Sequence, residues 1–195
     1  MKNSTILILG FGLTIPGFSN AASIDQENSV ERKYCGYHIE EKLSKNITEV
    51  YSTLIDGIYR TKVNISINLA VRSIQASFDF SCYAAPETDP YKHKTERTAR
   101  TVMEMVDSGG RYYRVIKWES KARGKGWTGT IAYTNEIFGD NQKSENPDQF
   151  LICPKNESIT CFYINISPEN RLSGKEPMEI KEVLSNISIE QTQKK

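Results

Sequence analysis

The sequence predicts an α+β protein in which one main helix packs on a twisted antiparallel β-sheet. Two observations lead to this prediction. Between residues 46 and 58, apolar residues recur at steps of three and four, which is the period of an amphipathic helix. After residue 62, short runs with alternating apolar and polar residues are separated by turn residues, which is typical of antiparallel strands. A helix therefore precedes a meander of strands.

Two helices are expected. The main helix would begin at Asn46, a possible N-cap with Glu49 three positions later. Its buried face would carry Ile47, Val50, Tyr51, Leu54 and Ile58. An additional C-terminal amphipathic helix is indicated by the spacing of Met178, Ile180, Val183, Leu184 and Ile187.

The expected strands follow the main helix. They are the segments 63–69, 77–83, 98–106, 111–119, 129–134, 150–153 and 161–166. The pairs Gly109-Gly110 and Gly124-x-Gly126 are the turn residues expected between antiparallel strands.

Residues 1–22 have the three parts of a secretory signal peptide. Lys2 precedes an apolar run at 6–13, and small residues follow up to Ala22. The apolar run has only about ten residues, which is too short for a helix that crosses a bilayer. We expect cleavage after Ala21 or Ala22 and a secreted, extracellular protein; an uncleaved membrane anchor is the alternative.

The rest of the chain fits a single domain and a monomer. We expect a flexible segment at 23–33, the folded domain at 34–166 and a C-terminal extension at 167–195.

The four cysteines predict two disulfides. An even number of cysteines in an exported chain is typical of disulfide bonding, and three pairings are possible. We expect Cys35 with Cys161 and Cys82 with Cys153. No metal site is expected, because there is no Cys-x-x-Cys pair and the only histidines are His38 and His93. No nucleotide cofactor is expected either, because phosphate-binding glycine motifs are absent.

Asn-x-Ser/Thr sequons mark candidate glycosylation sites. They lie at Asn64, Asn156, Asn165 and Asn186, and Asn46 also matches but would compete with its capping role.

The middle of the chain is basic. Residues 91–126 contain ten Lys or Arg against four Asp or Glu. Such a segment can meet a phosphate backbone or an acidic partner, although a solvated surface of mixed charge is the alternative. The candidate RNA-binding residues are Lys92, Lys94, Arg97, Arg100, Arg111, Arg114 and Lys117. Four interleaved aromatics would either stack on bases or fill the core, namely Tyr112, Tyr113, Trp118 and Trp127.

The same region holds a candidate catalytic set, formed by Tyr91, His93, Glu104 and Arg114. A carboxylate, an imidazole and a guanidinium on neighbouring strands can move protons and stabilise the charge that develops on a phosphate. This chemistry suits cleavage of a phosphodiester. Ordinary surface positions are the alternative.

The order of these features resembles the microbial guanyl-specific ribonucleases. An early cysteine, one helix, a Tyr-x-His and then Glu and Arg on successive strands occur in that order. The resemblance implies a ribonuclease-like fold with Tyr91, His93, Glu104 and Arg114 as catalytic candidates. Tyr133 stands where the family has its general-acid histidine. A tyrosine has an ordinary pKa of about 10, so it is a poor proton donor and acceptor at neutral pH.

The chain also resembles powdery-mildew effectors called RNase-like proteins associated with haustoria. The shared features are a signal peptide, an early Tyr34-Cys35, a late cysteine and the missing histidine. This resemblance implies a catalytically inactive, secreted effector, with possible entry into host cells, that binds host protein or RNA and needs no membrane or cofactor. The alternatives are an active guanyl-preferring endoribonuclease and an extracellular inhibitor or adhesion-type module.

Overall fold

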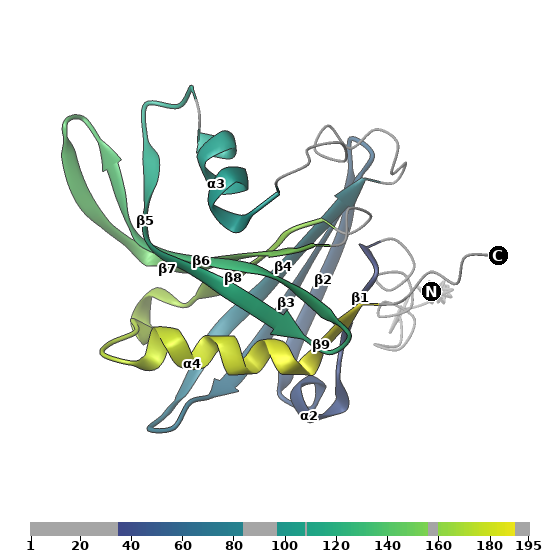
Figure 1. Cartoon of the computed structure of the whole chain (residues 1–195). Helices are drawn as coiled ribbons and strands as arrows, with labels where there is room; N and C mark the ends of the chain where they lie inside the picture. The colour runs from purple at the N-terminus through teal and green to yellow at the C-terminus, as the bar shows by residue number, and fades with distance from the viewer. Residues whose placement is uncertain (1–34, 84–96, 108, 156–159, 190–195) are drawn as a thin grey trace, which may run out of the picture.

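A computed structural model describes residues 35–83, 97–107, 109–155 and 160–189 of the chain (Figure 1). Several sequence predictions fall outside these residues. They concern the signal peptide at 1–22, the segment 23–33, Tyr34, Tyr91, Lys92, His93, Lys94 and Asn156.

The centre of the fold is a seven-stranded antiparallel sheet of order β2-β3-β4-β8-β7-β6-β5. Two meanders build it. The first contains β2 (Ile47–Ile55), β3 (Ile58–Asn68) and β4 (Ser73–Tyr83). The second contains β5 (Tyr113–Gly124), β6 (Trp127–Gly139), β7 (Gln142–Pro154) and β8 (Phe162–Ile166). The short β8 lies between β4 and β7 and joins the two meanders.

The prediction of one main helix packed on a sheet is wrong. Residues 47–55 form the edge strand β2, whose Val50 and Tyr51 are register partners of Val63 and Lys62 on β3. This strand is largely exposed on both faces, so its apolar residues need not alternate, and their spacing matches a helical period by coincidence. The tight turn into β3 follows at Asp56 and Gly57, which both have positive φ, as a two-residue hairpin loop requires.

The segment predicted as a strand at 98–106 is instead a helix, α3 (Ala99–Asp107). Ala99 and Met103 are buried one turn apart, and Val102 packs beside them. Consequently Gly109-Gly110 connects a helix to a strand, whereas Gly124 and Gly126 lie at the β5–β6 turn as predicted.

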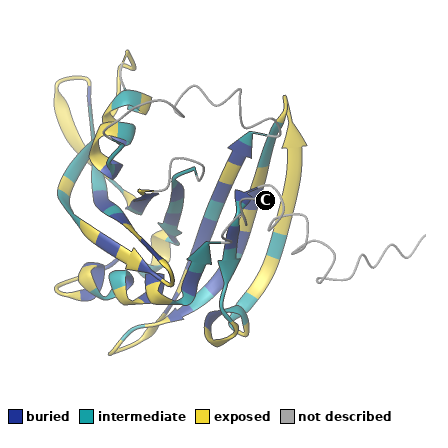
Figure 2. Cartoon of the chain, turned by 45° about the vertical axis from the view of Figure 1, so that its right-hand side comes forward, coloured by how far each residue is buried: buried dark blue, intermediate teal, exposed yellow. Residues whose placement is uncertain are grey.

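One side of the sheet, which we call the α4 face, carries the main core. It is covered by α4 (Glu176–Val183), by the 3-10 turn η3 (Leu184–Asn186), by α2 (Glu41–Ser44) and by a small sheet of β1 (Tyr37–Ile39) and β9 (Ile187–Ile189). Phe78, Phe150 and Phe162 are fully buried there. Figure 2 shows the alternation of buried and exposed residues along the strands, which is the two-residue period of a sheet.

The C-terminal segment is part of this core. A further 3-10 turn, η2 (Pro168–Asn170), leads into it. Leu172, Ile180, Val183, Leu184 and Ile187 are all buried against the sheet. The described residues of the expected extension therefore contribute to the same hydrophobic core as the strands.

The opposite side, which we call the α3 face, has a smaller core. Here α3 packs on Ala132, Leu151 and Cys153. Because α3 is only nine residues long, much of this face is not covered by it. The described helices are too short or too polar to serve as membrane spans.

All four cysteines form two disulfides, as predicted, but the predicted pairing is wrong. Cys35 is bonded to Cys82 and Cys153 to Cys161, with Cα separations of 5.3 and 4.3 Å. The reason is the alternation of the strands. Cys82 points into the core of the α4 face, where Cys35 also lies, whereas Cys153 belongs to the core of the α3 face. Cys82 and Cys153 therefore lie on opposite sides of the sheet and cannot bond.

Candidate functional site

A chain of polar contacts crosses the α3 face. It begins at Asp107, the last residue of α3, whose Oδ1 lies 2.6 Å from Nη2 of Arg114. Nη1 of Arg114 then donates to Oε1 of Gln149 at 3.0 Å. The same guanidinium lies 5.5 Å from the centre of the Tyr163 ring. Arg114 is thereby fixed by three different elements, namely α3, β7 and β8.

The chain continues across β8 to β4. Nε2 of Gln149 donates to Oδ1 of Asn165 at 2.6 Å, and Nδ2 of Asn165 donates to Oδ2 of Asp79. The other carboxylate oxygen, Oδ1 of Asp79, is buried and has no hydrogen-bond partner among the described residues. Burial raises the pKa of Asp79, while the neighbouring Lys62 opposes this shift. A buried polar atom without a partner is uncommon, and a carboxylate with a raised pKa in the wall of a cleft is a candidate functional group.

A cleft of ≈ 530 Å³ lies beside this chain, between α3 and the strands β2, β3, β4 and β8. Its wall is mainly apolar and includes Tyr51, Ile58, Val102, Val106, Leu151 and Tyr163. Its charged lining residues among those described are Arg60, Lys62, Asp79 and Arg97. Apolar walls with a few charged groups are typical of small-molecule sites.

A second groove of ≈ 640 Å³ shares Lys62 with the cleft. Amides and hydroxyls dominate its lining, which includes Asn64, Gln75, Ser77, Gln149 and Asn165. We choose the cleft as the candidate site because it combines an apolar wall with convergent charges and the unpartnered Asp79.

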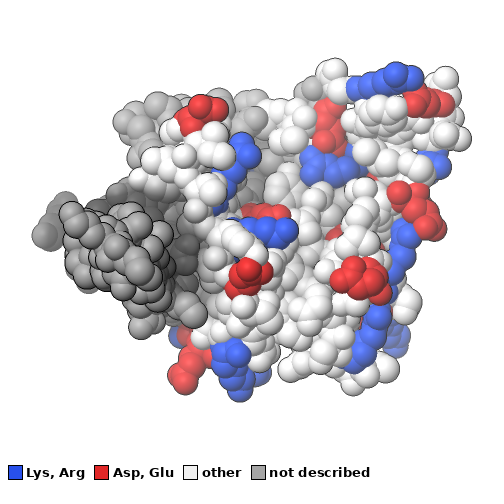
Figure 3. All heavy atoms as spheres, turned by 180° about the vertical axis from the view of Figure 1, so that it is seen from behind, with Lys and Arg blue, Asp and Glu red and all other residues white. Residues whose placement is uncertain are grey.

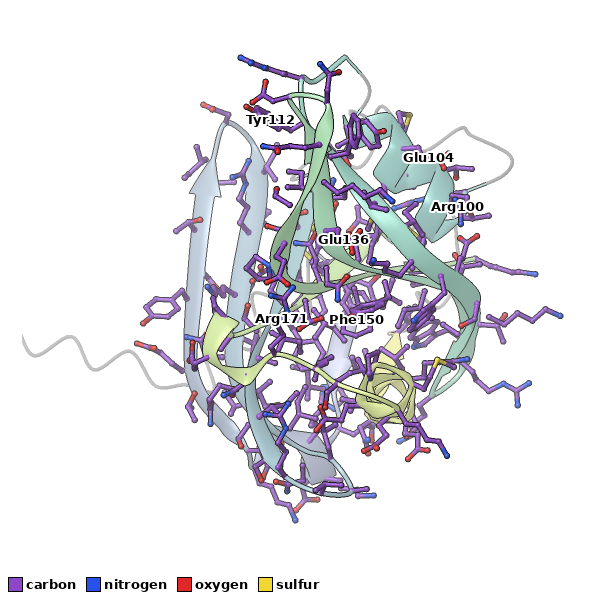
Figure 4. All side chains as sticks on the ribbon, turned by 90° about the vertical axis from the view of Figure 1, so that its left-hand side faces the viewer. Arg100, Glu104, Tyr112, Glu136, Phe150 and Arg171 are labelled. Carbon is purple, nitrogen blue, oxygen red and sulfur yellow. A yellow bond between two sulfur atoms is a disulfide. The ribbon has the colours of Figure 1, made fainter. Side chains whose placement is uncertain are left out.

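The described members of the predicted catalytic set do not come together. Arg114 is on the α3 face. Glu104 is on the exposed side of α3, 3.4 Å from Arg100 (Figure 4), and so belongs to a helix where a strand was expected. Tyr133 points to the other side of the sheet, where its ring stacks on Phe150 at 4.8 Å. Arg114, Glu104 and Tyr133 therefore lie in three separate places.

Tyr133 has a structural role in the main core. Its hydroxyl donates to Asp148, a buried carboxylate that also accepts a hydrogen bond from the backbone N–H of Leu172 at 2.8 Å. Burial and the hydrogen bond to Asp148 raise the pKa of Tyr133 well above its usual value. A tyrosine in this state keeps its proton throughout the neutral range.

Most described cations of the basic middle are neutralised by acids. Ion pairs join Arg100 to Glu104 and Glu119, Arg111 to Asp140, Arg114 to Asp107, Lys117 to Glu136, and Lys125 to Glu40. Arg97 instead lies with its Nε 3.2 Å from Sγ of Cys161. On the face shown in Figure 3, basic and acidic side chains are interspersed. The described part of the basic middle thus offers no continuous row of cations to a phosphate backbone.

The four aromatic residues of the basic middle were expected either to stack on bases or to fill the core. Trp127 is buried and Trp118 packs against the main core, so both have structural roles. Tyr112 and Tyr113 are each 47% exposed, but Tyr112 donates to Asp140 and the ring of Tyr113 packs in a tilted arrangement on that of Phe138.

Three of the four described sequon asparagines, Asn64, Asn165 and Asn186, donate a hydrogen bond from their amide nitrogen. Nδ2 of Asn64 donates to Glu49 at 3.3 Å and Nδ2 of Asn186 donates to the carbonyl of Val183 at 3.3 Å. At Asn165 this atom holds Asp79, so a glycan there would break the polar chain. Glycosylation stays a prediction.

Sequence reasoning missed the centre of the site. Its one signal was the segment Phe78-Asp79-Phe80, where a single carboxylate alternates with two core phenylalanines. This pattern places Asp79 on the face opposite to the main core. The partners Gln149 and Asn165 come from strands far away in the sequence, and no local pattern indicates them.

No family model, no curated protein and no solved structure matches the chain. Among the residues that the structure describes, no cluster of His, Cys, Asp or Glu has an arrangement suited to a metal ion.

Proposed function

We propose that the chain is an exported binding protein that holds a small amphipathic anion in the cleft of the α3 face. The observation that carries this proposal is the composition of the cleft. One end of a ligand would contact the apolar wall formed by Val102, Val106 and Leu151. Its charged end would meet the cations on β3.

The sign of the ligand's charge follows from the lining. Among the residues that the structure describes, three cations, Arg60, Lys62 and Arg97, line the cleft with one carboxylate, that of Asp79. Arg60 and Lys62 are two residues apart on β3, so both point to the α3 face. A carboxylate or sulfonate placed between them gains charge-assisted hydrogen bonds.

Asp79 supplies selectivity for a second polar group. The carboxylate of Asp79 lines the cleft, and a rotation of this side chain would bring its buried Oδ1 within reach of a hydroxyl or amide N–H of a ligand. A ligand without such a donor leaves this oxygen unpaired in a buried position, which is unfavourable.

Export is the other half of the proposal. It is supported by the signal-like N-terminal sequence and by two disulfides, which persist in oxidising compartments. Sequencing the N-terminus of the protein recovered outside the cytoplasm tests it. The result expected is a start at Ala22 or Ser23, and an intact Met1 would overturn export with cleavage.

The effector role was inferred from a ribonuclease-like arrangement of one main helix on a sheet. The chain does not adopt that arrangement, so the fold no longer supports this role. Binding of RNA also has little support, since the described cations of the basic middle mostly have acidic partners. We therefore propose the coarser role of a binding protein.

The test is a titration with 1-anilinonaphthalene-8-sulfonate, a fluorescent amphipathic anion. The double variant Arg60→Gln/Lys62→Gln is expected to weaken binding by about tenfold at low salt, a loss of about 1.4 kcal/mol. Its matched control is Lys121→Gln/Arg123→Gln, which removes two exposed cations that are also two residues apart, on β5. Equal affinities of the two double variants would overturn the proposal.

A second experiment separates the contribution of the ligand's charge to binding from that of its apolar chain. Octanoate is expected to displace the probe, whereas octylamine, with the same chain and the opposite charge, is not. Val106→Glu is expected to abolish probe binding without unfolding the protein, because this side chain is on the wall of the cleft yet its residue is 52% exposed. Displacement by octylamine at the same concentrations would contradict an anion site.

A further inference from the structure

The two edges of the large sheet are built differently. β5 has two irregularities in its pairing with β6, between Val115 and Trp118. It also carries exposed lysines at positions 117 and 121, and Lys125 beyond its end bridges to Ser188 of β9. Bulges, lysines and covering segments are the usual means by which proteins keep an edge strand from pairing with another chain.

β2 has few of these protections. From Glu49 to Ile55 its pairing with β3 is regular, and the nine-residue strand contains no proline, lysine or arginine. Three of its residues are large, apolar and about half exposed, namely Tyr51, Leu54 and Ile55. Among the described residues only β3 pairs with β2, and Figure 1 shows it at the edge of the sheet. A long, regular and apolar edge is a template for one more strand.

We propose that this strand is β2 of a second copy, in an antiparallel pair about a two-fold axis at Tyr51. In this register Tyr51 faces its own symmetry mate, Val50 faces Ser52 and Glu49 faces Thr53. The regular central part of the strand, residues 49–53, is then paired, and the irregularity between Ile47 and Glu49 lies outside it. Because partners differ by an even number of positions, the α3 faces of both copies lie on the same side of one continuous sheet.

The charges of the strand agree with this register. Glu49, its only charged residue, faces Thr53 of the other copy, so no like charges are opposed. A parallel, in-register pair would instead place Glu49 beside Glu49. The two-fold arrangement is also the commonest symmetry of homo-oligomers. The proposed dimer differs from the monomer expected from the sequence.

Cysteine cross-linking tests the register. All four native cysteines are in disulfides, so one added cysteine is the only free thiol. Directly opposed residues of an antiparallel pair have Cα atoms about 4.5–5.5 Å apart, within the range that a disulfide spans. Tyr51→Cys is therefore expected to form a covalent dimer under mild oxidation.

Leu54→Cys is the matched control, because Leu54 and Tyr51 are similarly exposed, at 55% and 49%. In the proposed register the two copies of residue 54 are separated by six strand positions, or about 20 Å, so no cross-link forms. Equally fast cross-linking of both variants would overturn the register.

Sedimentation of the native full-length mature chain tests the dimer without added thiols. We expect a reversible dimer that Tyr51→Lys dissociates, because two ammonium groups would then face each other. Tyr113→Lys changes a 47% exposed tyrosine on the protected edge and is expected to leave the dimer intact. A native chain that stays monomeric at high concentration would overturn the proposal, as would a dimer that survives Tyr51→Lys.

Discussion

The guanidinium of Arg114 and the carboxylate of Asp107 form an ion pair at 2.6 Å in which the two side chains are only 14% and 15% exposed. Oδ2 of Asp107 also accepts a hydrogen bond from the backbone N–H of Arg114 at 2.8 Å. Asp107 thus closes the turn between α3 and β5 and neutralises a cation that the sequence suggested for catalysis.

Removing this carboxylate should destabilise the fold. Asp107→Asn leaves a largely buried guanidinium without its counter-charge, and we expect a loss of about 3 kcal/mol in the free energy of unfolding, measured with urea. Arg111→Gln removes one partner of an exposed pair with Asp140 and should cost less than about 1 kcal/mol. Similar losses in the two variants would show that burial of the Asp107 pair contributes nothing.

Tyr133→Phe tests the hydrogen bond to Asp148. The variant leaves a buried carboxylate with one donor fewer, so we expect a destabilisation of about 1–3 kcal/mol. It should not change the affinity of the cleft for anilinonaphthalene sulfonate, because Tyr133 lies on the opposite face of the sheet. A changed affinity with unchanged stability would contradict this assignment.

The raised pKa of Tyr133 also predicts a pH dependence. The folded state holds this proton more tightly than the unfolded state, so the stabilisation is complete below the unfolded pKa of about 10 and is lost as the pH rises above it. Urea midpoints of the native protein should therefore fall more steeply above pH 10 than those of Tyr133→Phe. Parallel curves would contradict the prediction.

Glu176 predicts the opposite behaviour in acid. Hydrogen bonds from Arg72 and from the backbone of Ser173 lower the pKa of Glu176 to about 2. Because the folded pKa is below the unfolded one, this stabilisation is present above the ordinary pKa of about 4.3 and is lost as the pH falls towards 2. Glu176→Gln should have a lower melting temperature than the native protein at neutral pH. Its melting temperature should also change less than that of the native protein between pH 5 and pH 2. Glu145→Gln, at a pair whose carboxylate is 81% exposed, is the control.

The two disulfides should differ in their contribution to stability. Loop-closure entropy predicts about 4 kcal/mol for Cys35–Cys82 and about 2.5 kcal/mol for Cys153–Cys161, because the closed loops span 47 and 8 positions. The double variants Cys35→Ala/Cys82→Ala and Cys153→Ala/Cys161→Ala, compared by urea unfolding, test this order. Mass spectrometry of non-reduced peptides tests the pairing itself, and a Cys35–Cys161 peptide would contradict it.

How far the sequence predicts this fold depends on burial. The strands around Val63, Phe78, Ile131, Phe150 and Ile164 were predicted because each buries one face in the main core, which enforces alternation. β2 was misassigned because an exposed edge strand has no such constraint. α3 was misassigned although Ala99, Val102, Met103 and Val106 have helical spacing. Its threonine and valine residues favour a strand, and the packing against Leu151 that decides its structure is distant in sequence.

The candidate site was predictable only in part. Arg114 was singled out, but for a catalytic set that the described residues do not assemble. Asp79, Gln149 and Asn165 meet only because β8 lies between β4 and β7. Such an insertion of a late strand depends on tertiary pairing and leaves no signal in the local sequence.

The same insertion has a consequence for the timing of assembly. Ala76 on β4 pairs with Ile166 on β8, ninety positions later. The free edge of β4 in the first meander can therefore be paired only after β8 has been synthesised. Contacts between such distant segments slow folding, and unclosed edges favour aggregation. A newly made chain that stops short of β8 would consist of two unjoined half-sheets, so translation arrest before residue 162 should yield species that depend on chaperones for solubility.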